Sequence, residues 1–164
     1  MNDEKLTRIA EAVVKQLTDA EGTEAKPFGL AKAKKLIALV EEKAKTMGVK
    51  AVVAVSDASG RPIAVECMDD AYIASFDVAL KKAFTVVALK MSTKKLSGLA
   101  RPDGSLYGIQ YTNDGQIVIF GGGDPLIYKG KIVGGLGVSG GSEEQDTALS
   151  AYGASMLDDI MKDF

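Results

Sequence analysis

The chain has 164 residues, of which 46% are hydrophobic and 26% charged, with a net charge of −2 and a pI near 5.3. This length and composition fit one globular domain with a sizeable core. Lysines are spread along the chain without a basic stripe and interleaved aromatics, so we expect no nucleic-acid partner. The apolar runs fall short of the roughly 20 residues that cross a bilayer, and no signal-peptide pattern opens the chain. We therefore expect a cytoplasmic protein without a membrane partner.

The sequence contains no histidine and one cysteine, Cys67. This composition excludes Ser-His-Asp and Cys-His catalytic arrangements and zinc sites that use histidine. With no histidine to activate it, the Cys67 thiol is predicted to be a small buried hydrophobic group rather than a nucleophile. The acidic pairs at 69–70 and 143–144 are adjacent residues. Because sequence neighbours point in different directions, we predict no metal site.

The first predicted element is a short amphipathic helix within residues 1–19, followed by a linker over residues 20–29. An isolated helix of this length is marginal in water, so it needs a surface on which to lay its apolar stripe. That surface belongs either to its own domain or sister subunit, or to another protein, and the sequence leaves both interpretations open. The stripe residues, spaced by three, four and four, are Leu6, Ile9, Val13 and Leu17.

The remainder, residues 30–164, is predicted to form one α+β domain. Hairpins separated by helices, without regular β-α-β alternation, favour an antiparallel sheet of about five strands flanked by helices. The predicted helices cover residues 30–47, 73–91 and 142–160. The predicted strands cover residues 49–56, 61–67, 116–120 and 131–138, and a further strand is considered at 106–111.

Two glycine clusters, at 121–123 and 140–141, indicate where a ligand approaches the backbone. The second cluster precedes a helix, whose free N–H groups and macrodipole favour an anionic group. Alternatively, these glycines only permit a tight turn, with Ser142 and Gln145 forming a capping box that uses the free amides. Both interpretations remain open.

Other side chains extend this candidate site. Lys82 and Thr85 lie three residues apart on one helix face and offer a cation and a hydroxyl group to an anionic ligand, although Lys82 is as well explained by a salt bridge or by solvent. Asp124 offers a carboxylate, although Asp-Pro is also a common turn sequence. The predicted ligand-binding residues are Lys82, Thr85, Gly121, Gly122, Gly123, Asp124, Pro125, Gly140, Gly141 and Ser142.

The glycine-rich half of the chain resembles the signature of the GlcG/HbpS-like family, which includes the C-terminal domain of PduO. The matching stretches are Phe120-Gly121-Gly122-Gly123-Asp124-Pro125-Leu126 and Val138-Ser139-Gly140-Gly141-Ser142-Glu143-Glu144-Gln145-Asp146, with Ala54-Val55-Ser56-Asp57 upstream. The resemblance implies a profilin-like domain that self-associates and binds haem or a corrinoid such as cobalamin. The chain departs from the pattern at Cys67, where the family often has arginine, and at Asp70, where it has glycine. Without histidine, either another side chain such as tyrosine, methionine or cysteine would be the axial haem ligand, or the protein would supply no axial ligand.

These observations predict a non-enzymatic accessory protein that binds a small ligand or a tetrapyrrole. Residues 1–19 also resemble encapsulation peptides, which implies cargo in the lumen of a bacterial microcompartment and shell proteins as partners. One alternative is an enzyme acting on a small carbonyl or carboxylate substrate, with Lys82, Asp124 or Tyr107 as acid–base groups. Another is a purely structural assembly role.

Overall fold

A computed structural model describes residues 7, 11 and 28–163. The predicted N-terminal helix, with Leu6, Ile9, Val13 and Leu17, and nearly all of the predicted linker lie outside these residues and stay predictions. The described helices are α2 (Leu30–Thr46), α3 (Ser75–Ala88), α4 (Thr93–Leu99), α5 (Glu143–Ser155) and α6 (Leu157–Lys162), with short 3-10 turns η1 (Ile109–Tyr111) and η2 (Asn113–Gly115). The strands are β1 (Val52–Asp57), β2 (Pro62–Cys67), β3 (Gly123–Tyr128) and β4 (Lys131–Ser139).

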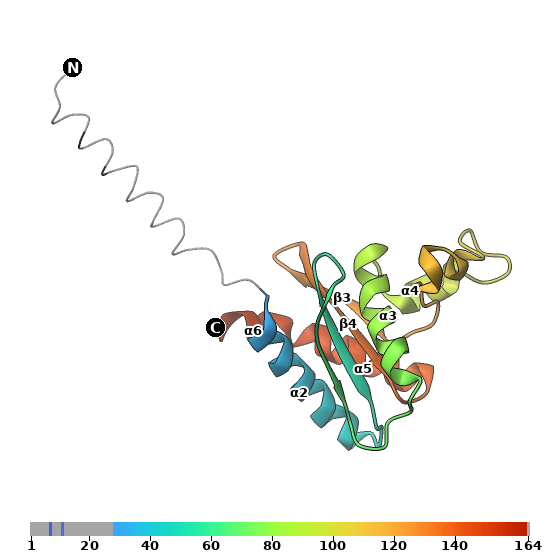
Figure 1. Cartoon of the computed structure of the whole chain (residues 1–164), viewed down its shortest axis with the longest axis horizontal. Helices are drawn as coiled ribbons and strands as arrows, with labels where there is room; N and C mark the ends of the chain where they lie inside the picture. The colour runs from blue at the N-terminus through green and yellow to red at the C-terminus, as the bar shows by residue number, and fades with distance from the viewer. Residues whose placement is uncertain (1–6, 8–10, 12–27, 164) are drawn as a thin grey trace.

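The four strands form one antiparallel sheet in the order β2-β1-β4-β3. Helices α2, α5 and α6 cover one face and α3 covers the other, so the sheet is the middle of three layers (Figure 1). This arrangement confirms the predicted α+β class. No helix in the described part of the chain is long and apolar enough to cross a membrane.

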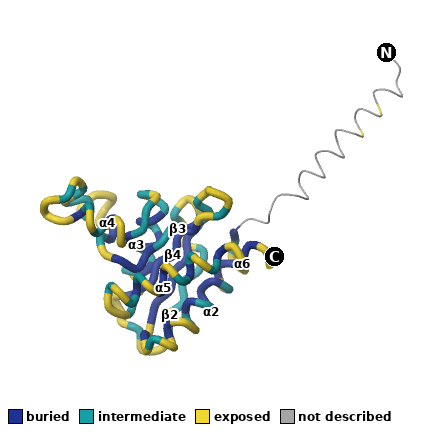
Figure 2. Tube along the Cα trace, turned by 180° about the vertical axis from the view of Figure 1, so that it is seen from behind, coloured by how far each residue is buried: buried dark blue, intermediate teal, exposed yellow. Residues whose placement is uncertain are grey.

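The middle of the sheet is buried (Figure 2), and clusters of apolar side chains lie on both of its faces. The larger cluster lies on the α2, α5 and α6 side and includes Leu36, Val53 and Leu136, all fully buried. The smaller cluster includes Val52 and Ala79 and lies under α3. Neighbouring residues of β1 thus enter different clusters, as expected when successive strand side chains point to opposite faces.

Helix α3 approaches β4 closely because glycine stands at the contact. A Cβ added at Gly137 would overlap the Ala79 carbonyl oxygen and would lie 2.7 Å from the Ala83 nitrogen. One at Gly135 would lie 2.8 Å from a methyl carbon of Val86. The backbone of α3 therefore rests almost directly on β4, which places the side chains of α3 next to the glycine clusters.

The predicted number of strands is too high for the described residues, which form four rather than five. The prediction of a strand at 116–120 is wrong because the Val118 N–H donates to the Thr85 hydroxyl rather than to a neighbouring strand. The segment considered at 106–111 contains the 3-10 turn η1 instead. Strand β3 begins later, at Gly123, which pairs with Gly137. The β3–β4 turn at 129–130 and the capping box of α5 are confirmed.

Candidate functional site

A buried ion pair lies between the two glycine clusters. The ammonium group of Lys82 has no exposed surface and donates to Asp146 Oδ2 at 2.9 Å and to the Val138 carbonyl oxygen at 2.7 Å. Its Nζ also lies 4.9 Å from the centroid of the Phe120 ring. The sequence left a salt bridge or solvent exposure as alternatives to ligand binding by Lys82. The structure shows the salt bridge and excludes exposure to solvent.

Burial lowers the pKa of Lys82 below its ordinary value, because desolvation disfavours the charged form. The Asp146 carboxylate opposes this shift through its charge and its hydrogen bond. A buried charge pair is favourable only when its remaining donors and acceptors are also satisfied. Here Asp146 Oδ1 accepts the Gly141 N–H at 2.9 Å, so the pair links α3, β4 and the start of α5.

Gly122 lies directly over this pair. Its φ of 109° belongs to the left-handed region, and an added Cβ would meet Lys82 Nζ at 2.5 Å and Asp146 Cβ at 2.7 Å. Only glycine fits such a position. The structure therefore brings Lys82, Gly122 and Gly141 together, as the prediction of one site requires, with Asp146 as the connection that the sequence interpretation missed.

Three amides at the N-terminus of α5 and in the two residues before it already have partners within the protein. The Ser142 N–H donates to the Gln145 side chain, the Gln145 N–H donates to the Ser142 hydroxyl, and the Gly141 N–H donates to Asp146. These hydrogen bonds agree with the interpretation of the cluster as a tight turn, because protein groups already accept the three N–H groups. Whether Gly140, Gly141 and Ser142 also face a ligand stays a prediction.

The first glycine cluster is held by side-chain hydrogen bonds from several helices. The Gly121 N–H donates to Glu143 Oε1 at 3.0 Å, and the Gly123 N–H donates to the Thr93 hydroxyl at 2.9 Å. The hydrogen bond from Gly121 lowers the pKa of Glu143. Thr85 is buried and holds the residues just before the cluster. These contacts fix the loop above the ion pair.

Asp124 and Pro125 lie on the edge strand β3, where proline removes no ladder hydrogen bond that the sheet needs. Asp124 Oδ2 accepts the Ser150 hydroxyl hydrogen at 2.6 Å, and burial raises the pKa of its carboxyl group. Tyr107 is 64% exposed and lies between α4 and η1. Within residues 28–163, no hydrogen bond or ion pair joins any two of Lys82, Asp124 and Tyr107.

Two hollows meet at Tyr72 and the second glycine cluster. One, of about 270 Å³, is lined by Phe120, Val78 and Asp146 among others. The second, of about 330 Å³, includes Lys50. They share three lining residues, which are Tyr72, Gly140 and Gly141. Together they form the hollowed surface nearest the buried pair, and two of the predicted ligand-binding residues line it.

Four large apolar side chains are exposed on this surface or in the chain segment that lines it: Tyr72 and Phe120 line the smaller hollow, and Ile73 and Phe76 adjoin the lining residues Tyr72, Ala74 and Ser75 in the sequence. Tyr72 is 73% exposed, Ile73 97%, Phe76 45% and Phe120 42%. Large apolar side chains that gather on a surface mark binding sites more often than isolated ones do. The only sequence signal for this surface was the helical spacing of Ile73 and Phe76, and that spacing predicted that both side chains are buried against the core. We name Tyr72, Ile73, Phe76 and Phe120 the apolar rim.

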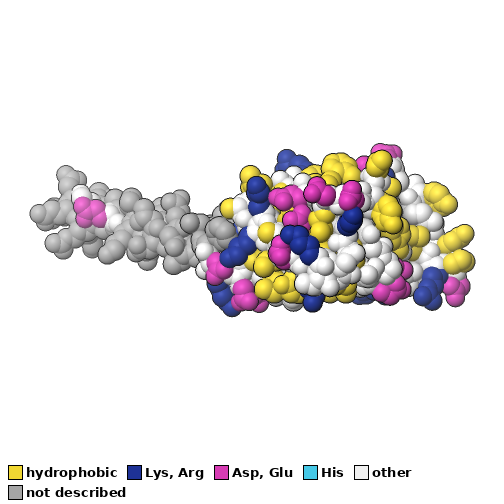
Figure 3. Space-filling model, turned by 90° about the horizontal axis from the view of Figure 1, so that it is seen from below, with side chains coloured by type: hydrophobic (Ala, Val, Ile, Leu, Met, Phe, Trp, Pro, Cys, Tyr) yellow, Lys and Arg dark blue, Asp and Glu magenta, His cyan; other side chains and the backbone are white. Residues whose placement is uncertain are grey.

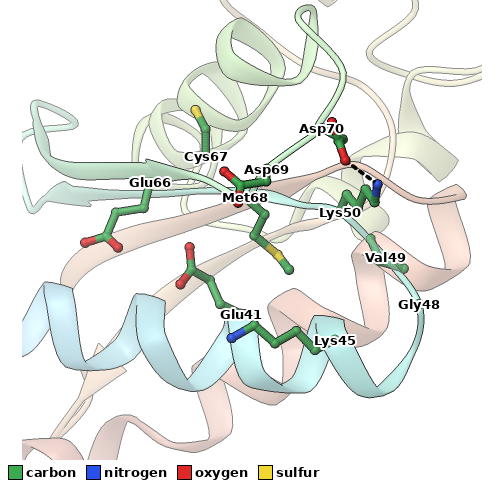
Figure 4. Close-up of a pocket in the computed structure, with 10 residues that line it drawn as sticks. All are labelled: Glu41, Lys45, Gly48, Val49, Lys50, Glu66, Cys67, Met68, Asp69 and Asp70. Carbon is green, nitrogen blue, oxygen red and sulfur yellow. Dashed lines mark hydrogen bonds and ion pairs between the residues drawn. The ribbon is translucent and has the colours of Figure 1, made fainter.

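A larger groove of about 650 Å³ lies between α2 and the end of β2 (Figure 4). Glu41 and the Met68 side chain point into it, whereas the Cys67 thiol points away from both. Cys67 is exposed at the end of β2, so the prediction that its thiol is buried is wrong. Burial and the nearby Glu66 carboxylate raise the pKa of Glu41.

The underside of the molecule, where acidic and basic side chains lie intermixed beside hydrophobic ones, is shown in Figure 3. Among the described residues, no group of three or more acidic or cysteine side chains is arranged to hold a metal ion.

Comparison with curated proteins finds relatives over most of the described domain. The chain is 46% identical over 121 residues to an uncharacterized 15.0 kDa protein of the dhaT-dhaS intergenic region of Citrobacter freundii, covering 74% of this chain and 85% of that protein. It is 44% identical over 109 residues to the corrinoid adenosyltransferase PduO of Salmonella typhimurium. That match covers 66% of this chain but only 32% of the adenosyltransferase, so the chain spans about a third of that enzyme.

Solved structures agree with these relatives. Klebsiella pneumoniae protein ORFY matches with a TM-score of 0.75 and 39% identity, over 82% of this chain and 90% of that one. A crystal structure of a PduOC complex with haem also matches with a TM-score of 0.75, at 36% identity, over 79% and 94% of the two chains. The family model described as haem degrading protein HbpS-like matches residues 28–155. The chain belongs to this HbpS-like family.

Proposed function

We propose that this protein is a non-enzymatic accessory protein that binds haem on the surface formed by the two hollows and the apolar rim. The observation that carries the proposal is an exposed apolar rim directly beside the second glycine cluster. A related domain of 36% identity has been crystallised with haem, which makes haem the first tetrapyrrole to test. Corrinoids are the second, because the family includes part of a corrinoid adenosyltransferase.

The residues at this surface fit a flat, largely apolar group with carboxylate arms. Phe120, Val78 and Ala74 offer apolar contacts to the macrocycle. The carboxylates that line the hollows all have lysine partners: Asp146 pairs with Lys82, Glu143 with Lys94 and Asp70 with Lys50. Because these negative charges are compensated, the surface does not repel a dianionic ligand as unpaired carboxylates would.

The groove between α2 and the end of β2, called the acidic groove from here on, fits haem less well. Four carboxylates line it, and its two lysines are already in ion pairs, Lys45 with Glu42 and Lys50 with Asp70. Within the part of the chain that the structure describes, Glu41, Glu66 and Asp69 have no ion pair. Surplus negative charge disfavours propionate groups, so the acidic groove is not the proposed haem site.

Titration of the full chain with ferric haemin is expected to give a saturable shift of the Soret band. A parallel titration with cobalamin, read in the corrin bands, is the comparison for the second tetrapyrrole. Introduction of a negative charge at one apolar rim residue, Phe120→Glu, should weaken haemin binding by about tenfold or more, because it places a carboxylate where the macrocycle would lie. Absence of a saturable shift with haemin would contradict the proposal.

The non-enzymatic part of the proposal is supported by the separate environments of Lys82, Asp124 and Tyr107. General acid–base catalysis needs groups within hydrogen-bond reach of the same reacting atoms. Lys82 is fully buried against Asp146, and Asp124 accepts a hydrogen bond from Ser150.

Self-association belongs to the same proposal, and the 97% exposure of Ile73 supports it.

We also propose that residues 1–19 direct the protein into the lumen of a bacterial microcompartment by binding its shell proteins. The periodic apolar stripe of Leu6, Ile9, Val13 and Leu17 supports this role, because a helix-in-groove contact is made by residues at such spacings. The competing role of the same stripe is packing on the protein's own domain. The PduO relatives make a compartment the first place to look.

A fluorescent fusion of the full chain is expected to form puncta in cells that express a compartment shell and to remain diffuse in cells without one. The variant Ile9→Glu/Val13→Glu should remain diffuse in both, because it breaks the stripe while leaving residues 28–163 unchanged. A matched substitution off the stripe, Lys5→Glu, should keep the puncta. Diffuse signal from the unaltered fusion, in cells where a known cargo is punctate, would remove the targeting role.

A further inference from the structure

Any side chain of this protein that binds haem iron must be a residue other than histidine. The sequence has none, so the remaining protein ligands known for haem iron are the cysteine thiolate, the methionine thioether and the tyrosine phenolate. The structure separates these candidates by place. This inference rests on the haem-binding function proposed above.

Among the described residues, no cysteine or methionine lines either hollow, and this includes Met91, which follows α3. Cys67 and Met68 belong to the acidic groove, where unpaired carboxylates disfavour a dianionic ligand. The Met68 sulfur accepts the Ala51 N–H at 3.3 Å, and its side chain packs against the larger core cluster. Met47 and Met156 also pack against that cluster, and Met161 is buried within it.

The tyrosines divide in the same way. Tyr128 and Tyr152 have lysine ammonium groups 5.3 Å and 5.7 Å from their ring centroids, and neither tyrosine lines the two hollows. Tyr107 and Tyr111 lie in the segment around η1, apart from the two hollows. Tyr72 lines both hollows and is 73% exposed. It therefore stands alone among these tyrosines at the surface where the apolar rim and the glycine cluster meet.

We propose that the Tyr72 phenolate is the protein ligand to haem iron in this chain. Phe120 and Val78 line the hollow on one side of Tyr72, and the Lys50–Asp70 pair lines the hollow on the other. The apolar side suits the macrocycle, and because Lys50 compensates the Asp70 carboxylate, the other side adds no unpaired negative charge beside the phenolate oxygen. The phenol loses its proton to solvent when the iron–oxygen bond forms.

The test uses ferric haemin with two full-length variants of Tyr72 and one control variant of Tyr111, and both tyrosines are exposed, so that folding is preserved. The unaltered protein should show the phenolate-to-iron charge-transfer absorption and an iron–phenolate vibration in resonance Raman spectra. Tyr72→Phe should lose both signals and bind haemin at least about tenfold more weakly. Tyr72→His should regain tight binding with a histidine-type spectrum. Tyr111→Phe, which alters another exposed tyrosine, should match the unaltered protein.

The outcomes separate this inference from the function on which it rests. If the unaltered protein gives no saturable Soret shift, haem binding itself fails. If it binds haemin but shows no phenolate signals, or if Tyr72→Phe and Tyr72→His leave the spectrum unchanged, haem binding stands and Tyr72 is not the ligand. Urea unfolding midpoints of the variants should equal that of the unaltered protein, which shows that lost binding does not reflect lost structure.

Discussion

Replacement of Lys82 by methionine is expected to lower the free energy of unfolding by about 3–5 kcal/mol. Methionine keeps the length of the apolar stem but removes the ammonium group, which leaves the Asp146 carboxylate buried without its cation. The Val138 carbonyl oxygen also loses a donor at 2.7 Å. Urea unfolding followed by circular dichroism measures the change, and an unchanged slope would show that only stability has moved.

Two further variants isolate the cause. In Lys82→Met/Asp146→Asn the uncompensated charge is gone while the amide oxygen can still accept the Gly141 N–H, so the double variant should be more stable than Lys82→Met alone. Lys94→Met removes the same type of charge from an exposed pair with Glu143 and should change stability by at most about 1 kcal/mol. A Lys82→Met loss as small as that of Lys94→Met would show that the buried pair does not hold this region together.

The elements that the sequence predicted correctly depend on local patterns. Helix α2 has a continuous apolar stripe, the β3–β4 turn has a positive-φ pair at Lys129 and Gly130, and the start of α5 has a complete capping box. Each of these signals acts within a few residues of the chain. The strand predicted at 116–120 failed because its outcome depends on a distant group, the Thr85 hydroxyl, which takes the Val118 N–H.

The candidate site was predictable in outline but not in its connections. The glycine clusters and Lys82 were expected together, and the structure does place Gly122 and Gly141 beside Lys82 and Asp146. The role of Asp146 was not visible, because an acidic residue in the first turn of a helix is equally explained by the helix dipole. The exposure of Ile73 and Phe76 was not visible either, since their helical spacing predicts burial.

The contact between α3 and β4 ties the glycine-rich signature to the geometry of the site. Gly135 and Gly137 let the helix backbone lie on the strand, and the same helix carries Lys82 and Thr85 to the glycine clusters. Gly135 and Gly137 therefore act on the site through the position of α3, and neither of them lines the two hollows. This role requires small size at those positions rather than unusual backbone angles, because neither glycine has a positive φ.

Gly137→Ala is accordingly expected to lower the free energy of unfolding by about 3 kcal/mol, at the upper end of the usual effect of overpacking. The added methyl group would overlap the Ala79 carbonyl oxygen, which is backbone and moves only if α3 moves. The matched control is Gly98→Ala in α4, where an added Cβ meets nothing within 4 Å. There the same substitution should raise stability by about 0.5–1 kcal/mol, since alanine is the better helix former.

Both variants are measured by urea unfolding under the same conditions, and the prediction is a difference in sign. Displacement of α3 should also weaken haemin binding by Gly137→Ala while leaving that of Gly98→Ala unchanged, because Lys82 and the apolar rim residue Phe76 lie on α3. Equal stability changes at the two positions would mean that β4 or α3 yields without strain. In that case the close contact would not be what positions the site.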